Sequence, residues 1–304
     1  MGAVIGILAV LFGLFTEELY RYMFCRKPSA LFEKLFDSKG HEEAYYVSRA
    51  AAEAKMRSRP CQTLTLRSRR GEALKGFYYD NGAQGKRVAF IVHGYRSEHN
   101  WTAGICFDYW ASRGFDVFAC DHTAHGASGG RYIGFDVLEH VDCLDWLALL
   151  VERCGPDTEV VLHGFSMGAA TVLQMSGHCP PNVSFIVEDS GFWCARASLA
   201  HQIGPMYQPM RLVDRLVAGY DLDDSDVTAS LARASMPILF VHGQDDKLVP
   251  FESGPRLYES YQGEKDCFFP ADTRHIEAMY TQPEQYAEKL DAFVEKYIKQ
   301  REKA

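Results

Sequence analysis

The sequence predicts an α/β fold with a mostly parallel central sheet flanked by helices, and three observations carry this prediction. Short apolar runs without polar alternation recur along the chain, as expected for strands that are buried on both faces. Helical segments separate these runs, which is typical of the crossovers between parallel strands. The 304 residues include only 25 glycines and 12 prolines, which excludes a fibrous or disordered chain.

The expected elements follow one another in a regular order. A polar helix is predicted over 41–57, and its small apolar residues Ala44, Val47, Ala51 and Ala54 share one face. Alternating residues over 63–67 and 74–79 predict an antiparallel hairpin. Buried strands are predicted at 88–92, 117–119, 160–162, 185–187 and 238–241, and further helices at 100–112, 137–153, 167–176 and 283–299.

One long interval breaks this order. About 45 residues separate the strand that ends at Asp189 from the strand that begins near Pro237, whereas a usual crossover is much shorter. The interval is rich in aromatic and methionine residues. Because ligands bind at the carboxyl edge of a parallel sheet, we expect residues 193–236 to form a helical cap insertion over that edge. Additional scaffold helices are the alternative.

Charge and cysteine content narrow the class of protein. The chain has 32 basic and 40 acidic residues, a net charge of −8, and no dense basic run before its C-terminal end. A nucleic-acid partner is therefore not expected. The nine cysteines include no C-x-x-C pair, and several lie in apolar runs, so we expect reduced structural thiols and no metal site.

The N-terminal segment poses the question of membrane association. Residues 1–15 contain no charged side chain, but such a helix is only about 22 Å long, against about 30 Å of hydrocarbon core. A cleaved signal peptide fits badly, because no basic residue precedes the run and no A-x-A site follows it. We expect 1–27 to be an apolar segment that anchors domain 28–304 to a membrane, with this domain in the cytoplasm. The alternatives are a helix that lies in the membrane interface and a soluble cytoplasmic protein in which this helix packs on the domain.

The strongest chemical signal is the pattern G-x-S-x-G at 164–168, directly after an expected strand and before an expected helix. In this context the pattern predicts a nucleophile elbow, a strained turn that holds the serine hydroxyl at the edge of the sheet. A side chain at Gly164 or Gly168 would collide with the neighbouring strand and helix. Ser166 is therefore the predicted nucleophile.

A serine needs a general base, and the base needs a carboxylate that orients it. In this fold the acid and then the base follow the serine along the chain. Asp245 and Asp246 follow the last buried strand and are both candidates for the acid. His275 is the only histidine after them, so it is the predicted base. The other ten histidines are expected to be structural.

An oxyanion hole should complete this arrangement. Its two donors are expected to be the amide after the nucleophile and an amide in the loop that follows an earlier strand. These are the backbone amides of Met167 and Tyr95, the latter in the segment His93-Gly94-Tyr95.

These motifs resemble the α/β-hydrolase superfamily, in particular bacterial membrane-associated serine hydrolases of the serine-aminopeptidase-like (S33, "hydrolase 4") group. The resemblance covers about residues 63–297. It includes the family's H-G-x-x-D-x-x-V-P segment at 242–250, which implies that Asp246 is the acid. The family's D-x-R-G-H-G-x-S-x-G loop falls on 121–130, where Thr123 and Ala124 replace the arginine and the first glycine.

The predicted function is a serine hydrolase, a carboxylesterase that cleaves a small-molecule acyl ester or lipid-like substrate without a cofactor. A peptidase, thioesterase, lysophospholipase or acyltransferase using the same triad is an alternative, and so is a non-catalytic binding protein on the same fold. An aminopeptidase would need acidic residues to hold the substrate amine. Asp221, Asp223, Asp224 and Asp226 are available, although such a run is usually a solvated loop. The oligomeric state is not predicted.

Overall fold

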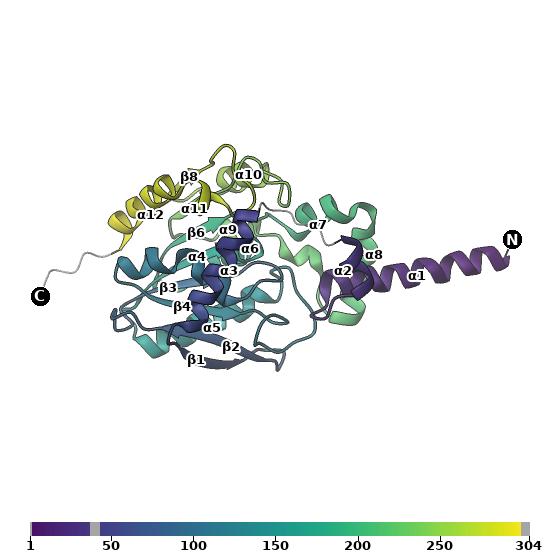
Figure 1. The fold of residues 1–304 in the computed structure, drawn as a ribbon, viewed down its shortest axis with the longest axis horizontal. Coiled ribbons are helices and arrows are strands. Elements are labelled where there is room, and N and C mark those ends of the chain that lie inside the picture. The colour runs from purple at the N-terminus through teal and green to yellow at the C-terminus, as the bar shows by residue number, and fades with distance from the viewer. Residues whose placement is uncertain (1, 37–42, 299–304) are drawn as a thin grey trace, which may run out of the picture.

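The computed structural model describes residues 2–36 and 43–298 (Figure 1). In this part of the chain eight strands form one sheet, in the order β1-β2-β4-β3-β5-β6-β7-β8. β1 (Gln62–Arg67) and β2 (Ala73–Tyr79) form the predicted antiparallel hairpin, and β2 pairs antiparallel with β4. All other neighbouring strands are parallel. The predicted α/β fold is confirmed.

The parallel strands are short and, except for the edge strand β8, consist mainly of buried apolar residues. They are β3 (Arg87–Val92), β4 (Asp116–Asp121), β5 (Glu159–Phe165), β6 (Val183–Asp189), β7 (Ile238–Val241) and β8 (Lys265–Phe268). Every residue of β4, β5 and β7 is buried, as expected for central strands between two helical layers. β8 was not predicted as a strand, because this edge segment is polar and only half-buried.

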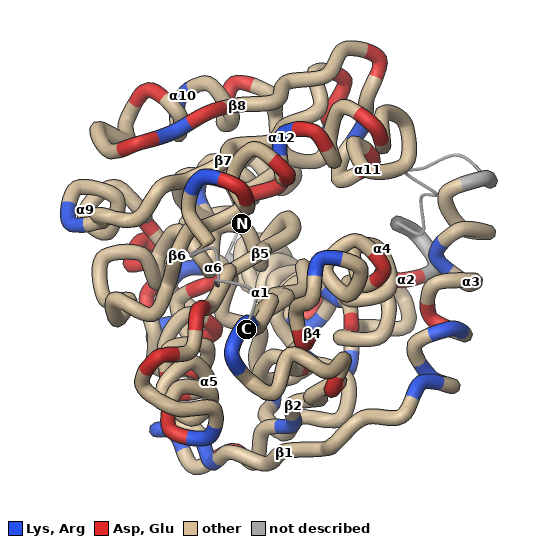
Figure 2. The backbone as a smooth tube through the Cα atoms, turned by 90° about the vertical axis from the view of Figure 1, so that its left-hand side faces the viewer, with Lys and Arg blue, Asp and Glu red and all other residues tan. Residues whose placement is uncertain are grey.

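Helices cover both faces of the sheet and enclose two cores. One face is covered by α3 (Glu43–Ser58), α4 (His99–Ser112), α11 (Ala278–Thr281) and α12 (Pro283–Tyr297). The other face is covered by α5 (Glu139–Cys154), α6 (Met167–Ser176), α9 (Thr228–Leu231) and α10 (Ser253–Ser260). Trp110 of α4 and Trp146 of α5 are fully buried, one on each side. Figure 2 shows acidic and basic residues mixed along outer helices such as α5 and α10.

The predicted apolar face of α3 is wrong in detail. Val47 is 61% exposed, whereas Tyr45 and Met56 are buried against the core. The Tyr45 ring packs edge-on against the Trp101 ring of α4, with 5.9 Å between centroids. An aromatic ring buries far more apolar area than an alanine or valine, so the large side chains determine which face of the helix packs inward.

The interval after β6 is helical, as predicted for the cap. It contains α7 (Ala195–Ile203), η1 (Gly204–Met206), α8 (Tyr207–Val213), η2 (Asp214–Ala218), η3 (Leu222–Ser225) and α9. Side chains of α7 and α8 share a third core with α1 (Gly2–Phe24) and α2 (Ala30–Phe36).

Helix α1 has two distinct halves. Its first half projects from the body of the molecule, and the side chains from Val4 to Phe15 are about half exposed (Figure 1). Its last residues are buried, and Phe24 has no exposed surface. The segment Ala3–Phe24 is long and apolar enough to cross a membrane.

A buried hydrogen bond joins α1 to the cap. The Tyr20 hydroxyl donates to Asp214 Oδ1 over 2.9 Å. Burial raises the pKa of the Asp214 carboxyl to about 7, although hydrogen bonds from Tyr220 and Tyr20 oppose this effect. A carboxyl whose pKa is higher in the folded than in the unfolded state contributes to the free energy of unfolding. This contribution is fully present below the unfolded-state pKa of about 4. This contribution is lost as the pH rises through the folded-state value.

We expect Asp214→Asn to reduce the fall in melting temperature between roughly pH 5 and pH 8, because the amide does not titrate. Thermal unfolding monitored by circular dichroism at both pH values measures this difference. The matched control is Asp108→Asn, which changes a carboxyl that is 71% exposed. The same pH dependence in wild type and Asp214→Asn would contradict the prediction.

Candidate active site

Ser166 lies in a sharp turn between β5 and α6. Its φ and ψ of 56° and −121° are outside the regions that residues with a side chain normally adopt. Its amide donates to Asp189 O of β6 over 2.8 Å, which holds the turn against the neighbouring strand. A Cβ atom at Gly164 would strike the backbone of Gly168, and one at Gly168 would strike Val92 O of β3. The expected strained elbow is therefore present.

The three residues predicted as a triad are brought together. His275 Nε2 lies 2.8 Å from Ser166 Oγ, and His275 Nδ1 lies 2.6 Å from Asp246 Oδ2. Ser166 follows β5, Asp246 follows β7 and His275 follows β8. All three therefore lie at the carboxyl edge of the parallel sheet, although Ser166 and His275 are 109 positions apart in the sequence. Asp246 and His275 are both buried.

Asp246, rather than Asp245, faces the histidine. Asp245 is exposed, whereas Asp246 Oδ1 accepts hydrogen bonds from the amides of Leu248 and Val249, each over 2.9 Å. Burial by itself would raise the pKa of Asp246, but the nearby His275 and His242 outweigh burial and hold this pKa well below its usual range. The carboxylate is therefore ionised at neutral pH. It favours the tautomer of His275 that carries its proton on Nδ1 and accepts one on Nε2.

A second histidine reaches the same carboxylate. His242 Nε2 lies 3.3 Å from Asp246 Oδ2 and 3.0 Å from Val249 O. Burial lowers the pKa of His242, but the hydrogen bond and charge of Asp246 outweigh burial and raise it. The sequence pattern predicts only a structural role for His242. Its position four residues before Asp246, at the end of a strand, was the available signal.

The backbone beside His275 is tied to β6. Ile276 N donates to Ser190 Oγ over 3.2 Å, and this hydroxyl donates to Asp189 Oδ1 over 2.8 Å. The Tyr286 hydroxyl donates to Asp189 Oδ2 over 3.0 Å. Burial raises the pKa of Asp189 to about 6, while its hydrogen bonds to Ser190 and Tyr286 favour the carboxylate. This network fixes the turn that carries the histidine.

The two amides expected to form an oxyanion hole lie beside the serine. Tyr95 and Met167 line the same cavity as Ser166. Within the described part of the chain, neither amide donates a hydrogen bond to another protein group. An oxyanion hole requires donors of this kind, held in place and free of protein acceptors.

Buried histidines hold the loop that carries the Tyr95 amide. His93 Nε2 accepts the His122 amide over 3.0 Å, so His93 Nδ1 carries the proton and donates to Gly94 O over 2.8 Å. His125 Nε2 accepts the Arg96 amide over 3.1 Å. Burial lowers the pKa of His93 to about 4 and that of His125 to about 3, so both are neutral at pH 7. His122 also contacts His93 O, which braces the loop without the family's arginine.

The cavity at Ser166 has a volume of about 380 Å³. Its wall includes residues from α1, from α2, from the cap and from the segments just before α2 and the cap, and none of them was predicted to belong to the site. These are Tyr22, Met23, Pro28, Glu33, Phe192, Ser198 and Gln202, in addition to Phe135, Leu248 and Val249. The C-terminal end of α1 therefore forms part of the site, whereas the first half of this helix projects from the molecule.

Arg96 joins α1 to the oxyanion loop. The last carbonyls of a helix lack partners within the helix. The Arg96 guanidinium donates to two of these at the end of α1, Tyr22 O over 2.5 Å and Cys25 O over 3.0 Å. The Tyr95 hydroxyl donates to a third, Met23 O, over 2.8 Å, and accepts from Arg96 Nε. The C-terminus of α1 is thus capped by the loop that presents the Tyr95 amide.

One group of potential metal ligands occurs among the described residues. The ligand atoms of Cys120, His122 and Cys143 all lie within 4.8 Å of one another, in the core beneath β4. Cys143 Sγ lies 4.0 Å from Cys120 Sγ and 3.9 Å from His122 Nδ1. Burial raises the pKa of the Cys143 thiol well above its usual range, which favours the neutral thiol over the thiolate that binds metals. None of the three residues lines the Ser166 cavity.

The sheet order and the strained turn at Ser166 are those of the α/β-hydrolase fold. The family model described as "Serine aminopeptidase, S33" matches residues 83–217, which include Ser166 and both oxyanion amides but end before Asp246. The chain has the α/β-hydrolase fold, and part of it is similar to this family.

Several relatives and solved structures are similar to this chain. The uncharacterized protein YqkD of Bacillus subtilis is 28% identical over 191 residues, which are 60% of this chain and 63% of that protein. A monoacylglycerol lipase of Mycolicibacterium smegmatis is 24% identical over 235 residues, covering 64% of this chain and 83% of the lipase. The Pyrococcus furiosus esterase Pf2001 shares the fold with a TM-score of 0.65 and 20% identity, over 80% of this chain and 92% of that one.

We expect Arg96→Ala to lower kcat/KM for an ester substrate about tenfold, because hydrogen bonds from a charged donor contribute about 1.5–3 kcal/mol. The loss should come with a lower melting temperature, since α1 loses its cap. Steady-state kinetics and thermal unfolding measure the two effects. Arg113→Ala is the control, because it removes a charged pair with Asp291 on the outer surface. Equal effects of the two substitutions would refute a positioning role for Arg96.

Proposed function

We propose that this hydrolase cleaves carboxylic esters by nucleophilic catalysis through Ser166, His275 and Asp246. The observation that carries the proposal is the continuous hydrogen-bond chain from Ser166 Oγ through His275 to Asp246. Two free amides line the same cavity, and the nucleophile lies on a strained turn. A binding protein without catalytic function would not require this combination.

In the first half-reaction Ser166 Oγ attacks the ester carbonyl while His275 Nε2 takes the hydroxyl proton. The charge that develops on His275 is stabilised by Asp246, which remains ionised. The amides of Tyr95 and Met167 donate to the carbonyl oxygen as it becomes an oxyanion, and each such donor is worth roughly 3–4 kcal/mol. His275 then protonates the leaving alcohol, which gives an acyl-serine.

In the second half-reaction a water molecule attacks the acyl-serine. His275 Nε2 takes a proton from this water and returns it to Ser166 Oγ as the bond to the acyl carbon breaks. The same two amides stabilise the second oxyanion. The carboxylic acid leaves and the free serine is restored, so the cycle requires water alone as co-substrate.

The lining of the cavity favours an ester with an apolar acyl group. Met23, Phe135, Phe192 and Leu248 contribute apolar side chains to it. The similarity to a protein named monoacylglycerol lipase, and to one named bifunctional esterase/perhydrolase, supports the same class of substrate. A lipid-like ester would also fit the apolar helix α1.

The acidic run of the cap does not favour an aminopeptidase. Asp221 and Asp223 pair with the guanidinium of Arg211, and Asp226 accepts the amide of Thr228. None of these carboxylates lines the Ser166 cavity, where they would have to hold a substrate amine.

A fluorophosphonate probe tests the nucleophile. We expect wild type to be labelled and Ser166→Ala to be unlabelled, since the probe reacts only with an activated serine. We expect Asp246→Asn to lower kcat about 10⁴-fold, because the wrong histidine tautomer is then favoured. Asp245→Asn is the matched control and should retain activity, because Asp245 is exposed and lies outside the chain of hydrogen bonds. Labelling of the Ser166→Ala protein, or of none of the folded proteins, would refute the proposal.

Substrate class is tested with p-nitrophenyl esters of increasing chain length and with aminoacyl anilides. We expect turnover of the esters, with a preference for acyl chains that fit about 380 Å³, and none of the anilides. Faster turnover of an aminoacyl anilide than of any ester would favour a peptidase instead.

We also propose that the projecting half of α1 attaches the protein to a membrane, with the hydrolase domain in the cytoplasm. The exposed apolar side chains from Val4 to Phe15 support this proposal. We expect deletion of residues 2–15 to release the protein from the membrane fraction while probe labelling of Ser166 is retained. A longer deletion would remove Tyr22 and Met23 from the site and would confuse the two effects. Membrane partitioning of the shortened protein would contradict the proposal.

A further inference from the structure

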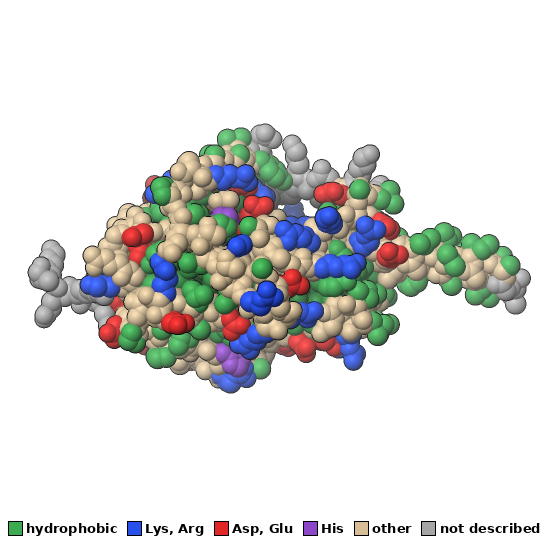
Figure 3. Space-filling model, turned by 90° about the horizontal axis from the view of Figure 1, so that it is seen from below, with side chains coloured by type: hydrophobic (Ala, Val, Ile, Leu, Met, Phe, Trp, Pro, Cys, Tyr) green, Lys and Arg blue, Asp and Glu red, His purple; other side chains and the backbone are tan. Residues whose placement is uncertain are grey.

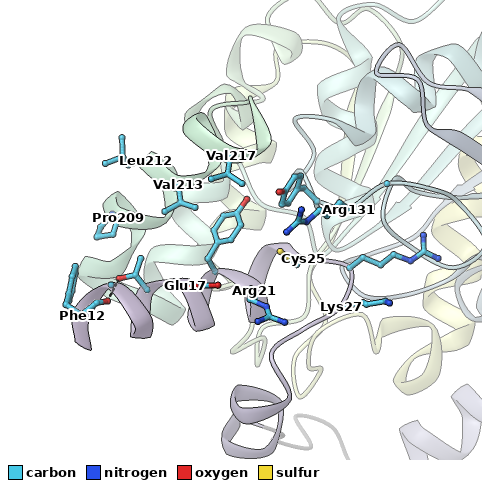
Figure 4. Close-up of a pocket in the computed structure, with 16 residues that line it drawn as sticks. Phe12, Glu17, Arg21, Cys25, Lys27, Arg131, Pro209, Leu212, Val213 and Val217 are labelled. Carbon is cyan, nitrogen blue, oxygen red and sulfur yellow. Dashed lines mark hydrogen bonds between the residues drawn. The ribbon is translucent and has the colours of Figure 1, made fainter. Parts of the chain in front are cut away.

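A second and larger cavity lies between α1 and the cap (Figure 4). Its volume is about 960 Å³, and it shares no lining residue with the Ser166 cavity. One wall consists of α1 residues from Phe12 to Arg21, and the other of cap residues from Pro209 to Val217. The reaction proposed above does not use this groove.

One end of the groove is apolar and open. Phe12 of α1 and Leu212 and Val217 of the cap line it, and each is more than half exposed. Leu216, in the same turn of η2, is 77% exposed. A contiguous apolar surface that remains open to solvent is typical of a binding site or a membrane contact.

The other end of the groove is basic. Arg21, Lys27 and Arg131 line it, and Figure 4 shows them at the end opposite Phe12 and Leu212. A fourth basic residue, Arg26, donates to the carbonyls of Gly126 and Ser128. Glu17 is the only acidic residue in the lining of the described groove. Figure 3 shows basic side chains gathered on the body of the molecule beside the base of α1.

This local charge is opposite to that of the whole chain, which has a net charge of −8. A long apolar wall that ends in three basic side chains complements a molecule with an apolar chain and an anionic head. A bilayer with anionic lipids presents many such molecules to a protein whose apolar helix enters it. Basic residues near an anionic membrane surface each contribute favourably to binding.

We propose that the groove between α1 and α8 binds one anionic phospholipid of a membrane. An acyl chain lies along Phe12, Leu212 and Val217, and the phosphate lies among Arg21, Lys27 and Arg131. Because the two walls come from α1 and the cap, the bound lipid links these elements beside the Tyr20–Asp214 hydrogen bond. The site is independent of the proposed esterase reaction.

The headgroup contact is tested by flotation with phosphatidylcholine vesicles, with and without phosphatidylglycerol. All proteins carry Ser166→Ala, so that no lipid is consumed and binding is measured without reference to activity. We expect tighter binding to the anionic vesicles. Combining Lys27→Gln with Arg131→Gln should lower this preference roughly ten- to thirtyfold. Arg57→Gln combined with Lys86→Gln is the matched control, because these exposed basic residues lie on α3 and before β3, away from the groove.

The groove itself is tested with a photoactivatable phosphatidylglycerol and peptide mapping of the cross-links. We expect cross-links in 12–21 and 209–217. Gly13 lines the groove and a Cβ atom there would meet open space, so we expect the side chain of Gly13→Trp to occupy the groove and to add apolar surface to α1. This variant should still bind vesicles but should lose most of its cross-links at 209–217.

Two results would overturn the proposal. One is equal binding to both kinds of vesicle, which would make α1 a simple apolar anchor. The other is unchanged cross-linking of the Gly13→Trp protein, which would place the lipid outside the groove. Fluorophosphonate labelling of the parent Ser166 protein is scored separately, so failure of the lipid site and failure of the esterase proposal are distinguishable.

Discussion

The site depends on the close approach of α6 to the ends of β3 and β5. Because Gly164 and Gly168 carry no side chain, the backbone after β5 turns back sharply and packs against Val92. This packing holds Ser166 at a φ of 56°, a conformation that costs about 1–3 kcal/mol when it is not supported. The Ser166 hydroxyl is thereby raised toward His275, and the Met167 amide remains free at the start of α6. A wider separation of helix and strand would remove both features together.

Around this turn, buried polar groups hold the other parts in place. Asp246 is fixed by two amides and faces two histidines, while Asp189 ties the backbone beside His275 to β6. Buried polar groups must be hydrogen-bonded, and once they are bonded they specify one arrangement. The histidines behind the oxyanion loop act in the same way, since burial keeps His93 and His125 neutral and able to accept amide protons.

Helix α1 both contributes to this site and projects from the body of the molecule. Its projecting half is apolar and exposed, and its buried half forms a wall of the Ser166 cavity. Arg96 caps the helix and stands next to Tyr95, so the end of α1 and the oxyanion loop are one structural unit. An N-terminal segment that would suit a membrane anchor is therefore also part of the proposed catalytic apparatus. The proposed lipid groove is lined by other residues of the same helix.

The sequence by itself determined the parallel sheet, the helical insertion and the identity of the residues that converge as a triad. These features are encoded locally, in apolar runs, in the glycines of the elbow and in the order of serine, acid and base. Tertiary structure decided what depends on distant contacts. It brought His242 to the acid, turned Tyr45 rather than Val47 inward, and placed α1 against the site. These contacts depend on how much apolar area the whole fold buries and on which buried polar groups it can pair by hydrogen bonds. A short stretch of sequence does not determine either quantity.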